Sequence, residues 1–88
     1  MQPSLDVRNP ATNEVIGTIK NTTPDDVDMY VSAAQEILPV WEKTAASKRS
    51  VLFVNAASLI RSRAEGLAAL LTTEQGKPLR EARDEILG

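Results

Sequence analysis

The sequence contains no cysteine and no histidine among its 88 residues. Without cysteine, the chain can form no disulfide and can offer neither a thiolate nucleophile nor a thiolate ligand for a metal. Without histidine, it lacks a common zinc ligand and the side chain that most often serves as a general base near neutral pH. Chemistry carried out by this chain would therefore depend on carboxylates, lysines, hydroxyl groups and Tyr30.

The sequence also lacks an excess of charge of one sign and a long apolar run. Ten Lys and Arg stand against twelve Asp and Glu, which gives a net charge of -2. This balance favours neither nucleic acid nor an anionic membrane as a partner. No stretch approaches the roughly 20 apolar residues of a membrane span, and the first residues do not resemble a secretory signal. We therefore expect a cytoplasmic location.

The residues that are present have the composition of a folded protein. Hydrophobic residues make up 42% of the chain and charged residues 25%, as in globular domains. A chain of this length forms one domain at most, with a modest core. Its patterns divide it into a hairpin over residues 1–21 and a helical part over residues 22–88.

The first part is expected to form a β-hairpin between Leu5 and Ile19. Two short runs, "LDV" and "EVIGTI", flank the turn-forming cluster "NPATNE". Asn13 suits a turn position with positive φ, and strand alternation places Val15, Gly17 and Ile19 on one face. Because a two-stranded ribbon is marginal alone, it should pack on another sheet or on the helices.

The helical part opens with a strong start signal, "NTTPDDVD". Thr23 is the expected N-cap and Pro24 the first helical residue, and acidic residues follow in the first turn. Proline lacks the backbone donor that a helix interior uses, so Pro39 is expected to end the helix, which we predict over Pro24 to Leu38. Its apolar face recurs at helical spacing and comprises Val27, Tyr30, Val31, Ala34, Ile37 and Leu38.

A second helix is expected to begin in "TAASKRS", where Ser47 is the best cap. Glycine inside a helix costs about 1 kcal/mol relative to alanine, so Gly66 predicts a bend or a break near Arg63 to Gly66 before helix continues toward Thr73. Two to four helices are thus expected in all. The long apolar stripe of this region comprises Leu52, Ala56, Leu59, Ile60, Leu67, Leu70 and Leu71.

The stretch "EQGKPL" raises the question of a phosphate-binding loop, because a glycine precedes a lysine. That loop requires G-x-x-x-x-G-K-[ST] after a strand, whereas here a helix precedes and Pro78 stands where a hydroxyl should bind magnesium. We interpret it as a helix end, with Gly76 in the left-handed conformation, Lys77 near the last carbonyls, and Pro78 as the first residue of a third helix. The apolar positions of that helix are Leu79, Ala82, Ile86 and Leu87.

Three further groups of side chains invite functional interpretations that their surroundings do not favour. The acidic residues of the last helix alternate with arginines, as on a solvated flank; they are Glu81, Asp84 and Glu85. The aromatic residues are expected to fill a small core; they are Tyr30, Trp41 and Phe53. The basic residues fit a surface of mixed charge better than a groove; they are Lys48, Arg49, Arg61 and Arg63. We assign no catalytic, cofactor-binding or metal-ligating residue.

The motifs follow one another in a specific order from Val7 to Ile86. "NPATNEVIG" comes first, then "DVD" at a helix start, a proline and a tryptophan, a helix rich in arginine and leucine, and "EQGKPL". This order and spacing resemble the N-terminal segment of the NAD(P)-dependent aldehyde dehydrogenase superfamily. Asn13 stands where that family has glycine, an exchange that a positive φ tolerates. The ending "TTEQGKPLREARDEI" is most similar to succinate or glutarate semialdehyde dehydrogenases.

The resemblance implies an α/β parent with a Rossmann-type cofactor domain, of which residues 1–88 would be the incomplete N-terminal part. Such a parent oxidises an aldehyde to a carboxylic acid through a thiohemiacetal on cysteine, passes hydride to NAD or NADP, and hydrolyses the thioester with water activated by a glutamate. In the family these groups lie beyond the matched stretch, so none carries over, and the segment itself is expected to bind no cofactor. The full-length protein is expected to be a homo-oligomer.

Two functional hypotheses follow. In the first, the segment is inert alone and packs against the remainder of the parent polypeptide, because its apolar faces exceed what 88 residues can cover. In the alternative, the chain is a stand-alone helical protein-interaction module that binds a partner through the stripe from Leu59 to Leu71.

Overall fold

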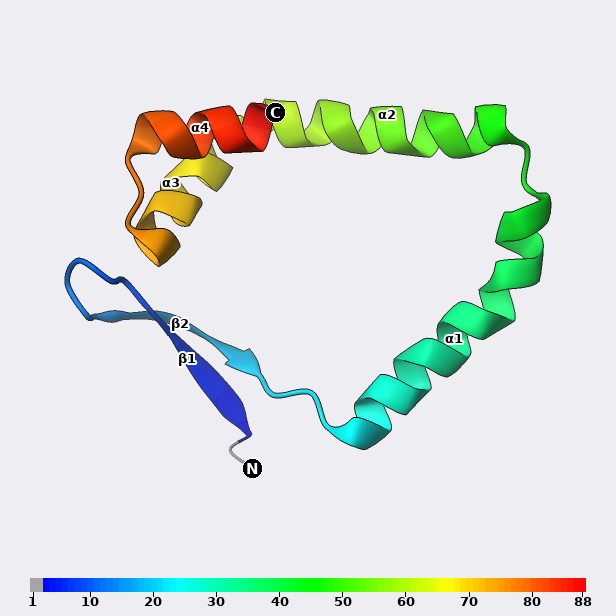
Figure 1. Cartoon of the computed structure of the whole chain (residues 1–88), viewed down its shortest axis with the longest axis horizontal. Coiled ribbons are helices and arrows are strands. Elements are labelled where there is room, and N and C mark those ends of the chain that lie inside the picture. The colour runs from blue at the N-terminus through cyan, green and yellow to red at the C-terminus, as the bar shows by residue number, and fades with distance from the viewer. Residues whose placement is uncertain (1–2) are drawn as a thin grey trace.

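The computed structural model describes residues 3–88, which form a hairpin followed by four helices (Figure 1). This order confirms the predicted fold of the segment, at the upper limit of the expected number of helices. The elements are β1 (Ser4–Arg8), β2 (Val15–Lys20), α1 (Pro24–Lys43), α2 (Ala46–Ser62), α3 (Ala64–Gln75) and α4 (Leu79–Leu87).

Strands β1 and β2 pair in the antiparallel direction, with Leu5 opposite Ile19. The register shifts between Val7 and Arg8, so that Arg8 lies opposite Val15. This irregularity adds a residue to β2 and changes the phase of the strand. The prediction that Val15 shares a face with Ile19 was therefore wrong, because strict alternation does not continue through the shift.

Helix α1 begins as the sequence predicts. Thr23 is the N-cap and Pro24 the first helical residue. The Thr23 hydroxyl accepts a hydrogen bond from the Asp26 amide at 3.1 Å, and the Thr23 amide donates to the Asp26 carboxylate at 3.0 Å. This reciprocal pair satisfies two backbone donors that a helix start otherwise leaves free.

The end of α1 differs from the prediction. Pro39 lies inside the helix, which continues beyond Leu38 to Lys43. Proline has a φ that fits a helix, but it removes one backbone donor and crowds the carbonyl four residues before it. The exposed setting of this turn leaves that carbonyl open to water. The helix ends where the Thr44 amide donates to the Trp41 carbonyl at 3.0 Å.

Helix α2 begins before the predicted cap. Ala45 is its N-cap and no side chain caps it, so the choice of Ser47 was wrong. The Ala45 carbonyl accepts hydrogen bonds from the amides of Lys48 and Arg49, at 3.0 and 3.1 Å. The first turn is therefore already closed around Ser47, and alanine favours the helix strongly enough to start it without a side-chain cap.

The predicted break between α2 and α3 is confirmed and lies at Arg63. This residue has φ -109° and ψ 11°, and it separates Ser62 of α2 from Ala64 of α3. Gly66 lies in the first turn of α3 and not at the break itself.

Helices α3 and α4 form a corner around Gly76. This glycine has φ 77° and caps α3 by donating its amide to the Thr72 carbonyl at 2.8 Å, which confirms the predicted left-handed helix end. Pro78 is the N-cap of α4 and not its first residue, a shift of one position. The two helices pack closely, and the buried residues of the described chain all come from them: Ala64, Ala68 and Ala82.

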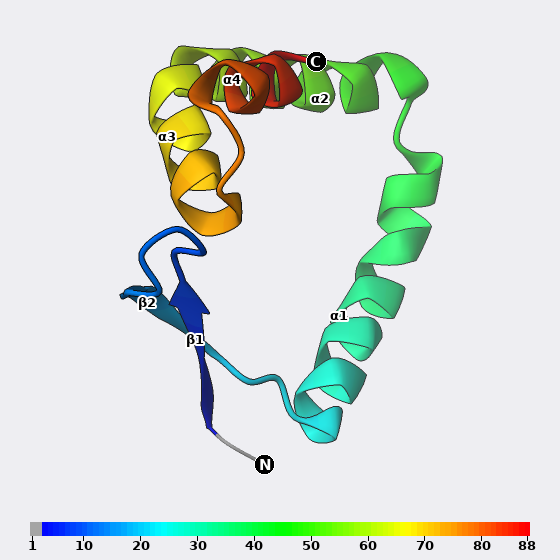
Figure 2. The same ribbon diagram turned by 60° about the vertical axis from the view of Figure 1, so that its left-hand side comes forward.

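The elements lie around an open ring and not around a common core (Figures 1 and 2). The radius of gyration is 17.6 Å, whereas a compact domain of this length has about 12 Å. Helix α1 makes no substantial packing contact with another element within residues 3–88. The arrangement therefore leaves the apolar faces of α1 and α2 in solvent.

Candidate functional site

The "EQGKPL" stretch forms the corner between α3 and α4. Lys77, which the sequence placed near the last carbonyls of α3, makes an ion pair with Glu85 of α4. The ammonium group is thereby directed to a carboxylate of the same corner, and a helix precedes the glycine. This geometry is that of a helix end braced by an ion pair, not of a loop whose amides surround a phosphate.

The charged side chains of α4 join it to α3. Arg83 donates a hydrogen bond to the Glu65 carboxylate at 2.8 Å. This bond lowers the pKa of Glu65 and raises the pKa of Arg83. Within residues 3–88, no three acidic side chains, including those of Glu81 and Asp84, gather closely enough to hold a metal ion. The ion pairs of Lys77 with Glu85 and of Arg83 with Glu65 therefore stabilise the corner between α3 and α4.

The aromatic residues do not form the small core that the sequence predicts. Trp41 and Phe53 meet edge to face, with ring centroids 6.5 Å apart, and the Arg49 guanidinium lies 5.9 Å from the Trp41 ring centre. Tyr30 stands apart on α1 and is 63% exposed. The prediction was wrong because α1 extends away from the other helices, so that Tyr30 has no neighbouring element to pack on.

The basic residues of α2 do not converge. Lys48 lies in its first turn, and Arg63 follows its last residue. Because a helix rises about 1.5 Å per residue, these two positions lie roughly 22 Å apart along the axis. Arg49 is engaged with Trp41, so the four basic side chains form no single groove.

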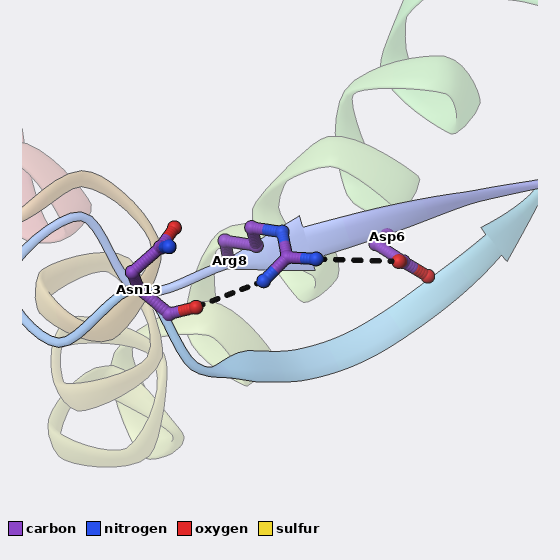
Figure 3. Close-up of polar contacts among 3 residues, drawn as sticks. All are labelled: Asp6, Arg8 and Asn13. Atoms are coloured by element: carbon purple, nitrogen blue, oxygen red, sulfur yellow. Dashed lines mark hydrogen bonds and ion pairs between the residues drawn. The ribbon is translucent and has the colours of Figure 1, made fainter.

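The polar contacts of the hairpin hold its turn (Figure 3). Arg8 donates a hydrogen bond to the Asn13 carbonyl at 2.9 Å and lies 3.8 Å from the Asp6 carboxylate. Asn13 has φ 62°, as predicted for this position. The hydrogen bond from Arg8 to the Asn13 carbonyl thus helps to fix the backbone of the turn.

What the described residues offer is an apolar surface and not an enclosed site. Residues 3–88 contain no pocket, and none of their helices is long and apolar enough to span a membrane. The side chains of what we call the α1–α2 apolar surface are between 44% and 67% exposed; they are Val27, Tyr30, Val31, Ile37, Leu38, Val51, Leu52, Phe53, Leu59 and Ile60. Exposed apolar side chains in this number are typical of a site that other polypeptide covers.

Comparison with known proteins identifies the segment. Residues 1–88 match the aldehyde dehydrogenase family. Glutarate-semialdehyde dehydrogenase of Pseudomonas putida is 41% identical over 83 residues, which are 94% of this chain and 17% of the relative. The acylating methylmalonate-semialdehyde dehydrogenase of Arabidopsis thaliana is 38% identical over 82 residues, which are 93% of this chain and 14% of the relative.

The backbone gives the same result. A crystal structure of an NADP-dependent enzyme from E. coli superposes with a TM-score of 0.93 and 36% identity, over 96% of this chain and 18% of that one. The chain thus spans less than a fifth of the length of the proteins that it matches. It belongs to the aldehyde dehydrogenase family, as the N-terminal segment of that family's fold.

Proposed function

We propose that these 88 residues serve as the N-terminal segment of an NAD(P)-dependent dehydrogenase that oxidises a semialdehyde. The observation that carries the proposal is the match, at a TM-score of 0.93 and 36% identity, to an NADP-dependent enzyme. The names of the curated relatives support the substrate class, since the two described above act on semialdehydes.

Within that enzyme, the segment is a scaffold of the cofactor-binding domain. This chain has no cysteine, so the thiol that attacks the aldehyde comes from elsewhere in the polypeptide. The α1–α2 apolar surface supports the scaffold role, because fully burying one Val, Leu, Ile or Phe side chain is worth about 1.5–3 kcal/mol. Ten half-exposed side chains therefore supply a strong drive to pack against the remaining polypeptide.

The test is an assay of the full polypeptide that carries these residues. Reduction of NAD+ and of NADP+ is followed with succinate semialdehyde and glutarate semialdehyde, and butanal and pentanal serve as controls that have the same carbon count and lack the carboxylate. We expect faster reduction with a semialdehyde than with its control. Reduction of neither nicotinamide by any of the four aldehydes refutes the activity, and a preference for the uncharged controls refutes the substrate class.

A further inference from the structure

The turn of the hairpin meets the α3–α4 corner, although the two lie far apart in the sequence. Both views place the loop between β1 and β2 beside the end of α3 (Figures 1 and 2). The contact is between Pro10 and Gly76: a β-carbon added to Gly76 would stand 3.0 Å from Pro10 Cγ and 3.9 Å from Pro10 Cβ. The first distance is tighter than most carbon contacts, so a β-carbon at position 76 would require the proline ring to move by a few tenths of an ångström.

The turn that carries Pro10 is held in one conformation. The Asn9 amide donates to the Glu14 carbonyl at 2.9 Å, and the Asn13 amide donates to the Asn9 carbonyl at 2.7 Å. The Ala11 amide donates to the Asn9 side chain at 2.8 Å. Since the ring of Pro10 also fixes its own φ, the hairpin presents this ring at a defined place.

The corner that carries Gly76 is equally constrained. Its amide is bonded to the Thr72 carbonyl, its φ is 77°, and the following residue, Lys77, is paired with Glu85 of α4. Contact between two constrained segments fixes their relative direction more firmly than contact through long flexible side chains. Strands β1 and β2 themselves make no substantial packing contact with a helix within residues 3–88.

We propose that the contact of Pro10 with Gly76 is a latch that sets the direction of the hairpin relative to α3 and α4. The latch requires glycine at position 76 for two independent reasons. The positive φ disfavours residues with a β-carbon, and a β-carbon would press against the ring of Pro10 unless that ring moved. This inference concerns the fold and goes beyond the proposed dehydrogenase activity.

A double-mutant cycle in the full polypeptide tests the latch. Gly76→Asn retains the left-handed conformation better than most substitutions, because asparagine tolerates positive φ, so its effect reports mainly the added side chain. Pro10→Ala removes Cγ and keeps Cβ, which lies at an ordinary contact distance. We expect Gly76→Asn to lower Tm, and we expect at least half of this shift to disappear when Pro10 is also alanine.

The matched control is Gly66→Ala. Gly66 has no atom within 4 Å of an added β-carbon and no positive φ, so this substitution should shift Tm equally in both backgrounds. Equal shifts for Gly76→Asn in both backgrounds overturn the latch. If Gly76→Asn folds only when Pro10 is alanine, the latch is supported; if it folds in neither background, the contact is not the cause and the proposal fails.

Hydrogen exchange supplies a readout in a different element from the substitution. Gly76→Asn changes a helix corner, yet a latch predicts faster exchange of the β1–β2 amides and unchanged exchange in α2. Unchanged exchange in the hairpin overturns the proposal. Both measurements need neither substrate nor cofactor, so their outcome is independent of whether the dehydrogenase assay succeeds.

Discussion

Residues 1–88 produced without further polypeptide are expected to associate with one another, because too much apolar surface lies in water. The described arrangement has an accessible surface of 7194 Å². A compact monomer of 9.6 kDa exposes about 5,100 Å². The excess is therefore about 2,100 Å².

The size of this excess decides the expected behaviour. If 55–60% of it is apolar, as on protein surfaces generally, about 1,200 Å² of apolar area is left uncovered, which corresponds to about 30 kcal/mol at 25 cal/mol per Å². This value exceeds the roughly 5–15 kcal/mol of net stability of a typical domain. The segment alone therefore has a strong drive to bury its apolar faces in some other way.

The assay combines light scattering with small-angle X-ray scattering over a range of concentrations. We expect a mass that rises with concentration, binding of a hydrophobic dye and weakly cooperative unfolding. A control chain with Val31→Gln and Ile37→Gln should associate less, because both side chains are more than half exposed. A concentration-independent monomer with a radius of gyration near 12 Å and a sharp melt would refute the reasoning.

Three smaller predictions follow from single contacts. Thr23→Ala removes the N-cap and should destabilise α1 by about 1 kcal/mol, seen as lost helix in the circular dichroism of a peptide over residues 21–43; unchanged helicity contradicts the cap. The hydrogen bond from the Thr23 amide lowers the pKa of Asp26 below its ordinary 3.8. The stabilisation that this hydrogen bond gives to α1 is therefore present above pH 3.8 and is lost as the pH falls through the lowered pKa. Asp26→Asn should remove this acid-dependent loss of helix from the same peptide. In the full polypeptide, Ile37→Ser should lower the free energy of unfolding by about 2–4 kcal/mol, because we propose that Ile37 is buried there. The control Gln35→Ser, on the same helix, should change the free energy of unfolding by less than about 0.5 kcal/mol. Equal effects of the two substitutions would show that Ile37 faces water.

The features that the sequence predicts correctly depend on near neighbours along the chain. Thr23 and Pro24 specify a helix start, because the hydrogen bonds and the fixed φ involve residues within one turn. Asn13 and Gly76 take positive φ, because few other residues adopt that conformation at low cost. Local chemistry was sufficient for these elements, and the family resemblance then gave their order.

The errors arise where two local signals compete. Pro39 is a helix breaker by its own chemistry, yet the helix on either side of it is favourable enough to continue to Lys43. Ser47 is a good cap, yet two alanines before it begin the helix earlier. In both cases the sum over a turn outweighed the preference of a single residue.

Contacts between distant segments could not be predicted in this way. Nothing near Gly76 in the sequence indicates that Pro10 will lie against it, and nothing near Tyr30 indicates that α1 will extend away from the other helices. The left-handed φ gave a sufficient reason for the glycine, and this concealed the second reason. The contact became visible only when the two segments were placed in space.

The distribution of residue sizes between the buried and exposed positions argues against a self-sufficient domain. Globular proteins bury their large aliphatic side chains most often, whereas the fully covered residues here are the small ones, Ala68 and Ala82, at 0% exposure. Small residues let α3 and α4 approach closely, which explains why they are covered. The large residues of the predicted stripe, such as Leu59 and Leu70, remain about half exposed. Amphipathic stripes are expected to face a partner, and the packing of helices within residues 3–88 leaves these large side chains half uncovered. The same stripes that gave helix positions from the sequence therefore locate, in space, the surface that the proposed parent enzyme would cover.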